Sequence, residues 1–464
     1  MAIYKTPGVY IEEIPLFPPS VAQVETAIPA FIGYTKKAKK ENDDLTQKPT
    51  RITSLVEYTQ YFGLSEDETD LEVVLTKDSA DRTIIEVKFE TGKTPSVHNM
   101  YYALQMFFAN GGGPCYIVSV APTGTAGIDK AKLKAGLDAL KKEDEPTLII
   151  FPEAVTGLDA DYGALMSDAL KQCKELKDRF AIMDVKVDAT KTIAENATAF
   201  RTAVTGTPEE LKYGAAYYPN VKTTFPFSFQ EADVKVTDNR GGTALPGTLD
   251  AVAPVDNSVY NLIKAKLNTF FMAMAPSSSV AGIYASVDRD RGVWKAPANV
   301  PVSNVIGPDI KVTDSDQDGL NIDTTAGKSI NVIRAFIGKG TLVWGARTLA
   351  GNDNEWRYIS VRRFFNMVEE SVKKATYQFV FEPNDANTWV KVRAMIENYL
   401  TVLWRQGALA GAKPEHAFYV RVGLNITMTA QDILEGYMHV EIGMAVVRPA
   451  EFIVLKFSHK MQES

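Results

Sequence analysis

The sequence is poor in the residues that build metal centres and disulfide frameworks. Its 464 residues include two cysteines and four histidines. Cys115 falls in an apolar stretch and Cys173 in a stretch with helical spacing, far away in the sequence, so we interpret both as reduced structural thiols and a disulfide as the less favoured alternative. The histidines lack the spacing of metal ligands; they are His98, His416, His439 and His459. The sequence therefore predicts no metal site.

A basic excess and a long hydrophobic run are both missing. The net charge is −7, which gives no support for a nucleic-acid-binding surface. No apolar run approaches the roughly 20 residues that cross a bilayer, and Met1–Lys5 lacks the apolar segment of a signal peptide. We therefore expect no nucleic-acid partner and no membrane insertion. We also expect that the protein is synthesised in the cytoplasm without a signal peptide.

Two motifs resemble ligand-binding loops but are incomplete. Gly327–Ser329 matches the end of a phosphate-binding loop, yet Ile322 stands where that loop needs a glycine. Asp314–Gly319 carries carboxylates at alternate positions, as a calcium loop does, but Thr325 replaces the required glutamate. We expect a solvated acidic turn at 314–319 and no cofactor.

A catalytic constellation is also missing. No Gly-x-Ser-x-Gly motif occurs, and Ser277–Ser279 are the only prominent serines beside a glycine-containing turn. Among the histidines, only His98 lies near the middle region of about 98 to 350, and it stands at the very edge of that region, so the residues give no Ser/His/Asp triad. We predict no catalytic residues and no enzymatic activity.

The residues that are present indicate an α/β protein of about three domains. Strands are predicted at 115–120, 148–151, 180–184 and 281–285, with helices at 131–141 and 162–177. This alternation from about 98 to 350 favours a mostly parallel sheet.

Two β-rich excursions interrupt this pattern. Residues 71–76 and 83–89 read as a hairpin around the polar turn 77–81, and residues 222–250 read as a β excursion or a long surface loop.

The C-terminal region predicts two amphipathic helices. The first starts near Asn354, which we expect to cap it, and its apolar stripe is Tyr358, Val361, Phe365, Val368 and Val372. The second runs from Asn387 to Gln406, and strands at 417–422 and 437–447 follow. The charged residues of the first helix, including Arg357, Arg362 and Arg363, form either a solvated face or contacts between subunits.

Both ends of the chain read as extended arms. Four prolines within residues 1–20 exclude a helix, and Ile3–Lys5 and Val9–Ile11 can each form a short strand. At the other end, residues 451–460 read as a strand in which Ile453, Leu455 and Phe457 face one side and Phe452, Val454 and Lys456 the other. These strands either complete the sheets of their own chain or add to a neighbouring subunit.

Several blocks resemble contractile tail sheath proteins, which form the outer sleeve of contractile phages, R-type pyocins and extracellular contractile injection systems. They follow the family's order along nearly the whole chain: Tyr4–Glu13, Pro29–Gly33, Phe107–Gly113, Pro276–Tyr284 with Asp288 and Gly292, Val343–Thr348, Gly351–Arg363, Phe381–Asn384 and Arg448–Phe452. The resemblance implies an α/β middle domain of subtilisin-like topology, an α+β C-terminal domain and β-rich insertions, so that the whole chain is α+β.

The resemblance also implies a function. The expected protein is a structural subunit that polymerises as stacked hexameric rings around an inner tube and contracts to drive the tube through a target envelope. Its expected partners are itself, the inner tube protein, baseplate and terminator or cap proteins, and paralogous sheath subunits. It would be made in the bacterial cytoplasm and assembled into a phage-tail-like particle. The alternatives are an α/β hydrolase-like enzyme and a static tube or capsid protein.

The family further suggests where the contacts lie. The arms are expected to pair with neighbouring subunits through Ile3, Tyr4, Val9, Ile11, Phe452, Ile453, Val454, Leu455 and Phe457. A C-terminal helix faces the inner tube in the family, and the candidates here are Lys391, Arg393, Arg405 and Lys413. We expect an N-terminal arm (1–20), a segment with the hairpin insertion (21–97), a middle domain (98–350, with its β excursion near 220–250), a C-terminal domain (351–448) and a C-terminal strand arm (449–464).

Overall fold

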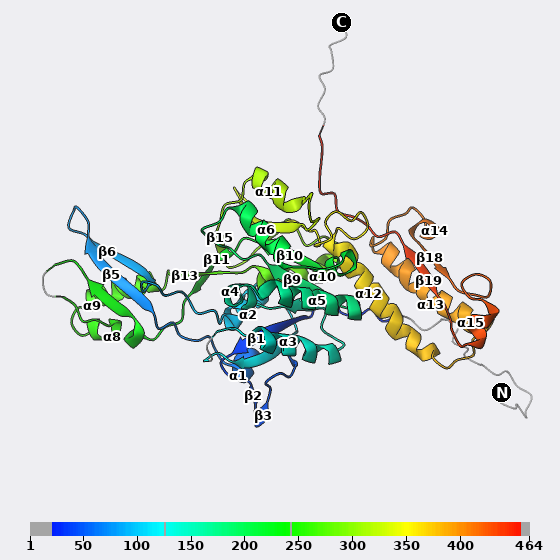
Figure 1. Ribbon diagram of the computed structural model, residues 1–464, viewed down its shortest axis with the longest axis horizontal. Coiled ribbons are helices and arrows are strands. Elements are labelled where there is room, and N and C mark those ends of the chain that lie inside the picture. Colours follow the sequence, from blue (N-terminus) through cyan, green and yellow to red (C-terminus); the bar gives the residue numbers. More distant parts are fainter. Residues whose placement is uncertain (1–20, 125–126, 242–243, 456–464) are drawn as a thin grey trace, which may run out of the picture. The chain divides into compact units, whose positions relative to one another are not determined.

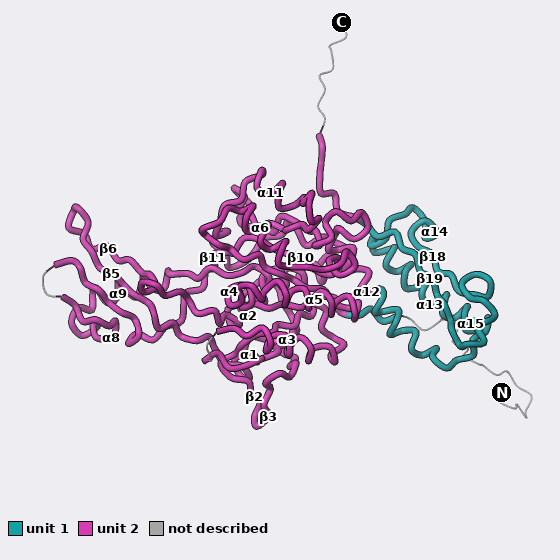
Figure 2. Tube along the Cα trace, in the orientation of Figure 1, with its two compact units in different colours: residues 1–24, 368–447 teal, residues 25–367, 448–464 magenta. Residues whose placement is uncertain are grey.

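The computed structural model of the chain describes residues 21–124, 127–241 and 244–455. The chain divides into two compact units: unit 1 holds residues 1–24 and 368–447, and unit 2 holds residues 25–367 and 448–464 (Figure 2). The arm residues Ile3, Tyr4, Val9, Ile11 and Phe457 lie outside the described residues. Within the described part, no helix is both long enough and apolar enough to span a membrane.

Unit 2 is built on a sheet of nine strands in the described residues, in the order β14-β17-β16-β10-β9-β8-β1-β7-β4 (Figure 1). The strands from β16 to β7 run parallel, while β4, β14 and β17 are antiparallel to their neighbours. Every residue of β1 and β9 is buried, as expected of parallel strands that are covered on both faces. The strands are β1 (Pro29–Thr35), β4 (Thr50–Ile52), β7 (Cys115–Pro122), β8 (Leu148–Ile150), β9 (Phe180–Asp184), β10 (Gly214–Tyr218), β14 (Val300–Pro301), β16 (Ile330–Phe336) and β17 (Gly340–Trp344).

Helices cover both faces of this sheet. Because alternate side chains of a strand point to opposite faces, Ile32 of β1 enters one apolar core and Phe31 enters the other. The first core packs against α3 (Lys130–Ala139) with η1 (Leu140–Lys142), α4 (Ala154–Gly157), α5 (Tyr162–Leu176), α6 (Ile193–Ala203), α7 (Pro208–Leu211) and α11 (Asp314–Asn321). The second packs against α1 (Leu55–Phe62), α2 (Met100–Ala109), α10 (Ser277–Arg291) and the start of α12 (Ile359–Thr376). The α/β fold class is confirmed.

The strands predicted at 115–120, 148–151 and 180–184 are confirmed, but the one at 281–285 is wrong. Those residues lie in α10, where Val280, Ile283, Tyr284 and Val287 are buried at helical spacing. The short run Ala-Gly-Ile-Tyr-Ala fits both the helical and the strand period of apolar residues, so the pattern alone could not distinguish a helix from a strand. A Cβ atom on Gly282 would overlap the backbone of α2, which shows why a small residue is needed in this helix.

An insertion lobe extends unit 2 (Figure 1, left) and consists of residues 71–89 and 235–267. β5 (Leu71–Lys77) and β6 (Thr83–Phe89) form the predicted hairpin, with Val73 opposite Val87. β12 (Lys235–Asp238) adds parallel to β5, and α8 (Leu249–Val252) and α9 (Asn257–Leu267) close a separate apolar core. The two excursions seen in the sequence therefore build one structure.

Shorter elements connect the lobe to the main sheet and complete unit 2. β11 (Val221–Pro226) lies between β13 (Phe271–Met274) and β15 (Val305–Pro308) in a second sheet, and η2 (Glu231–Asp233) follows β11. β2 (Lys39–Lys40) and β3 (Asp43–Asp44) form a small hairpin.

The first C-terminal helix, α12, begins later than expected. Asn354 does not cap it: its Oδ1 accepts a hydrogen bond from Arg357 Nη2 at 2.6 Å. Tyr358 instead pairs with Arg347 in an isolated bridge, and the Ile359 N–H donates to the Ala346 carbonyl. This extended pairing keeps residues 357–358 out of the helix and delays its start to Ile359. The predicted stripe is buried at Val361, Val368 and Val372 and half-buried at Tyr358 and Phe365.

Unit 1 contains the end of α12 and the remaining C-terminal elements. These are η3 (Tyr377–Phe379), α13 (Ala386–Arg405), α14 (Pro414–Ala417), β18 (Phe418–Arg421), α15 (Ala430–Leu434) and β19 (Glu441–Met444). The Asp385 side chain caps α13 by accepting the Thr388 N–H at 3.0 Å. In the described residues β18 and β19 form an antiparallel sheet of two strands, so the strand predicted at 437–447 is shorter than expected.

Candidate functional site

The C-terminal arm leaves unit 2 at a partly buried ion pair between Arg347 and Glu451. Arg347 Nε lies 2.9 Å from Glu451 Oε1, and Arg347 Nη2 lies 2.7 Å from Oε2. The Tyr358 hydroxyl donates to Oε2 at 3.1 Å, and the Asn321 amide donates to Oε1 at 2.9 Å. The Arg347 side chain is 4% exposed and that of Glu451 21%. We call Arg347, Glu451, Asn321 and Tyr358 the C-arm clamp. The two-point pairing of Arg347 with the Glu451 carboxylate fixes the orientation of these two side chains as well as the distance between them.

The sheet holds the arginine side of this clamp. The Arg347 N–H donates to Asn331 Oδ1 at 2.8 Å, and Asn331 Nδ2 donates to the Arg347 carbonyl at 2.8 Å. Asn331 belongs to β16 and is buried. The blocks 343–348 and 448–452, which stand far apart in sequence, therefore meet at one ion pair.

Burial and charge act in opposite directions on Glu451. Burial disfavours its ionised form, but the hydrogen bonds from Arg347, Asn321 and Tyr358 and the charge of Arg347 more than offset it, so the pKa of Glu451 lies below its usual range. Burial, together with the Glu451 carboxylate, raises the pKa of Tyr358. At neutral pH the clamp therefore joins a carboxylate to charged and neutral donors.

Apolar side chains lie exposed directly after the clamp. Their exposed fractions are 69% for Phe452, 78% for Ile453, 78% for Val454 and 72% for Leu455. Residues 451–455 belong to no strand of this chain, so this part of the predicted strand does not complete a sheet of its own subunit. Pairing with a neighbouring subunit stays a prediction.

A second buried ion pair lies at the root of the N-terminal arm. Arg363 Nη1 lies 3.0 Å from Asp288 Oδ1, and these side chains are 3% and 6% exposed. The Thr26 hydroxyl donates to Asp288 Oδ2 at 2.6 Å, while its carbonyl accepts from Arg363 Nη2 at 2.9 Å. We call Thr26, Asp288 and Arg363 the N-arm clamp. In unit 1, the Val24 N–H donates to Ser371 Oγ at 3.1 Å.

The solvated face expected around Arg362 and Arg363 is wrong. Arg362 is 2% exposed, and its guanidinium lies 4.4 Å from the ring centre of Trp356 and 4.8 Å from that of Tyr213. Arginine tolerates this burial because its planar group stacks on aromatic rings. Both guanidinium groups are thus used inside the subunit and do not face a neighbour. Arg357 is half-buried, and its contact with another subunit stays a prediction.

The inner-tube candidates lie on the surface of unit 1. Lys391, Arg393 and Arg405 of α13 and Lys413 before α14 are all exposed. Arg393 Nε pairs with Glu397 Oε1 at 2.7 Å, which lowers the local positive excess. Val390 and Val402 are 66% and 44% exposed on the same helix, so α13 presents apolar groups as well as positive charge.

The two incomplete ligand motifs have structural roles. Lys328 Nζ donates to the carbonyls of Arg201 and Val204, where a cation satisfies the C-terminal end of α6. The acidic turn predicted at 314–319 is wrong, because these residues begin α11. Thr313 and Asp316 form a reciprocal capping box there, so the carboxylates suit a helix N-terminus.

The serines and the histidine near the sheet contact different carboxylates. The Ser277 N–H donates to Asp184 Oδ1 at 2.8 Å, whereas His98 Nδ1 lies 3.8 Å from Glu153 Oε1. In the part of the chain that the structure describes, no three His, Cys, Asp or Glu residues gather as a metal site.

The ligand position of an α/β sheet is filled by side chains. The strand order reverses between β1 and β8, where such sheets bind ligands beyond the carboxyl ends of the strands. Here the buried Glu153 carboxylate accepts the Tyr34 N–H at 2.7 Å. A Cβ atom on Gly33 would lie 2.7 Å from this carboxylate. The crevice is therefore packed, which favours a structural role for it.

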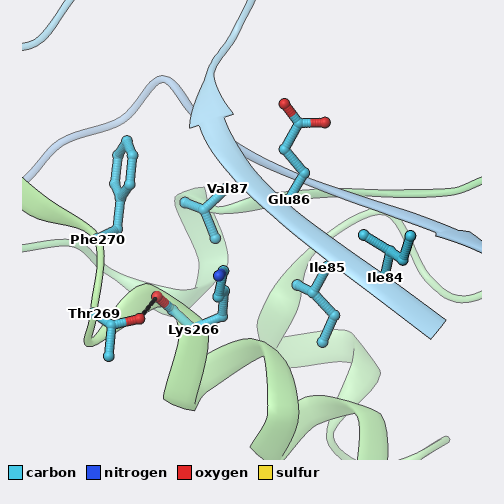
Figure 3. Close-up of a pocket in the computed structure, with 7 residues that line it drawn as sticks. All are labelled: Ile84, Ile85, Glu86, Val87, Lys266, Thr269 and Phe270. Atoms are coloured by element: carbon cyan, nitrogen blue, oxygen red, sulfur yellow. Dashed lines mark hydrogen bonds between the residues drawn. The ribbon is translucent and has the colours of Figure 1, made fainter. Parts of the chain in front are cut away.

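A shallow depression of about 470 Å³ lies on the insertion lobe between β6 and the end of α9 (Figure 3). Ile85 and Val87 of β6 line it together with Lys266, Thr269 and Phe270. Its polar groups do not converge as they do in a small-molecule site.

Comparison with known proteins gives consistent matches. The phage tail sheath protein central domain matches residues 126–349, and the phage tail sheath C-terminal domain matches residues 351–460. The sheath of PVC, an extracellular contractile injection system, solved in its contracted state, is 31% identical with a TM-score of 0.65 over 99% of both chains. The contracted helical sheath of the anti-feeding prophage is 33% identical with a TM-score of 0.65, over 99% of this chain and 100% of that chain.

A curated relative matches over a shorter stretch. The tail sheath protein of Burkholderia phage BcepMu is 30% identical over 142 residues, which are 30% of this chain and 29% of that protein. The match thus spans less than a third of that relative, whereas the two solved sheaths match nearly end to end.

Proposed function

Because the chain belongs to the phage tail sheath family, we propose that it is a structural subunit of a contractile sheath. Hexameric rings of this subunit would stack around an inner tube, and contraction of the stack would drive the tube through a target envelope. Family membership places the chain among structural proteins, and the alternative of an α/β hydrolase-like enzyme is dropped.

The observation that carries this proposal is the near end-to-end match to two contracted sheaths. The C-terminal arm supports it independently, because Phe452–Leu455 expose apolar side chains after a fixed anchor. Such a segment is suited to add a strand to another chain, where backbone hydrogen bonds supply the affinity. Contacts of this heterologous kind generate a helical polymer when they do not close on themselves.

The proposed partners follow from this arrangement. The arms would join subunits to each other, and the exposed face of α13 with Lys413 would meet the inner tube. Baseplate and cap proteins would bind the ends of the polymer, and paralogous subunits could share it. The subunit would be made in the bacterial cytoplasm without a signal peptide and assembled into a phage-tail-like particle or virion that can be released outside the cell. The division into arms, middle domain and C-terminal domain at residues 20, 97, 350 and 448 is retained as part of the proposal.

Electron microscopy of the protein produced with its inner tube tests the proposal. We expect tube-filled sleeves of two lengths and widths, because a contractile sheath needs two stable packings. A rigid polymer of one fixed form would support the alternative of a static tube or capsid protein. The absence of any polymer would overturn both.

A further inference from the structure

We infer that the Arg347–Glu451 ion pair is the fixed anchor from which the C-terminal arm is presented, and that Arg347 acts through Glu451 as a positioning residue for assembly. This inference rests on the proposed function, because it gives the arm a task outside its own subunit. It concerns the root of the arm and not the strand that follows it.

A single side chain attaches the segment 448–455 to the rest of the described chain. Within residues 448–455, the hydrogen bonds to the rest of the described chain come from the carboxylate of Glu451, which Arg347, Asn321 and Tyr358 hold. The residues that follow are largely exposed. The position at which the arm starts is therefore set by Glu451.

Arg347, the other half of the ion pair, is held in place by the sheet. Asn331 brackets the backbone of Arg347 with two hydrogen bonds of 2.8 Å, and the Arg347 side chain is 4% exposed. Removing the charge of Glu451 would leave a buried guanidinium without its counter-ion, which is far more costly than losing an exposed pair. Loss of the Glu451 carboxylate should therefore be costly because the Arg347 side chain is buried.

The chain passes from unit 1 back to unit 2 just before the C-terminal arm. β19 and the Val447 N–H, which donates to the Ala408 carbonyl at 3.2 Å, belong to unit 1. Only a few residues later, Glu451 is held by residues of unit 2. The clamp therefore ties the arm to unit 2, although unit 1 precedes it in sequence. Whatever unit 1 does during contraction, the root of the arm stays with the sheet that carries Arg347.

The variant Glu451→Gln tests this inference, because it keeps the size of the side chain and removes its charge. Polymerisation with the inner tube should fall about tenfold or more, since truncating one partner of a buried charge pair is costly. The melting temperature of the subunit should fall, because the buried Arg347 guanidinium loses its counter-ion, but the subunit should stay folded at the temperature of assembly. The matched control is Asp314→Asn, which removes a carboxylate 2.7 Å from Arg334 elsewhere in unit 2, and it should polymerise normally.

The double variant Arg347→Glu with Glu451→Arg exchanges the two charges. It distinguishes a role of the ion pair in positioning the arm from the simple loss of a side chain. We expect it to recover part of the polymerisation that each single variant loses, because the pair interaction is restored. Polymerisation of Glu451→Gln at the wild-type level would overturn the inference. So would a fall in melting temperature that accounts for the whole loss of assembly.

A measurement on the monomer keeps the inference testable if no sheath forms. Spin labels on Ile453→Cys and Lys339→Cys report the distance from the arm to the sheet, and the native Cys115 and Cys173 are buried. The distance distribution should broaden in Glu451→Gln and stay unchanged in Asp314→Asn. An unchanged distribution in Glu451→Gln would contradict the anchor itself, whereas a failure of the wild type to polymerise would contradict only the proposed function.

Discussion

Two arginine–carboxylate pairs, each with a buried arginine, lie at the roots of the arms. Arg347 reaches Glu451 across 104 residues of sequence, and Arg363 reaches Asp288 across 75. A local pattern counts only apolar residues toward the core, so it assigns arginines to the surface. Burying a charge requires a partner, and no periodicity identifies a partner at that separation. The residues that anchor the roots of the arms were therefore not predictable from sequence, and the pairing of the arms with neighbouring subunits stays a prediction.

A third buried charge, Asp184, should make stability depend on pH. Its side chain is 2% exposed, and burial raises its pKa from 3.8 to about 7 against the opposing hydrogen bonds from Ser277. Because the folded pKa lies above the unfolded one, stability is highest below the unfolded pKa and falls as pH rises toward the folded pKa. We expect Asp184→Asn to gain unfolding free energy over the wild type between pH 4 and 7, by about 1.4 kcal/mol per unit of pKa shift.

Chemical denaturation of both proteins at several pH values between 4 and 8 measures this difference. The gain should level off above the folded pKa. The exposed Asp314→Asn is the control and should show no such trend. A difference between Asp184→Asn and the wild type that is constant with pH would contradict the raised pKa.

At the scale of elements, the sequence predicted helices and strands well where a single pattern of apolar residues dominates. The strands of the main sheet and the hairpin of β5 and β6 were recognisable because they are continuous apolar or alternating runs. The insertion lobe was not recognisable from sequence, because residues 71–89 and 235–267 meet only through the pairing of β12 with β5 and through a shared apolar core. The start of α12 was missed because a bridge to Arg347 competes with the cap at Asn354.

The element that should touch the inner tube is α13. Reversing the charges of Lys391, Arg393 and Lys413 to glutamate should yield sheaths that assemble contracted and without a tube. Each exposed charge contact is worth only about 0.2–1 kcal/mol, so the extended state depends on many of them, and they can all release on contraction. Electron microscopy at physiological salt measures the fraction of tube-filled particles.

A matched variant shows whether the position of the charges matters. Reversal of Lys171, Lys177 and Lys339, which are exposed on unit 2, changes the net charge equally and should leave tube-filled particles intact. Extended, tube-filled particles from the α13 variant would remove this helix as the attachment surface.

At the scale of the whole molecule, the residues that form the apolar cores differ from the arm residues that we propose to link subunits. The apolar cores of unit 2 draw their buried residues from Ile28 to Ile359 and use none from residues 448–455. The described C-terminal arm carries exposed apolar residues that contribute nothing to these cores. A contractile polymer needs this separation, because its interfaces must repack between two states while each subunit stays folded.

Truncation of the arm after its anchor should therefore abolish assembly without unfolding the subunit. Deleting residues 452–464 keeps Glu451 and the C-arm clamp, so circular dichroism should show cooperative melting close to that of the wild type. Deleting 451–464 also removes the counter-ion of Arg347, and we expect a lower melting temperature because a buried charge is left unpaired. Both deletions, and deletion of residues 1–15, should fail to form stable sheaths under the electron microscope. Sheaths from the 452–464 deletion at wild-type yield would show that subunits are joined by other surfaces, and a loss of cooperative melting would show that the arm belongs to the fold of its own chain.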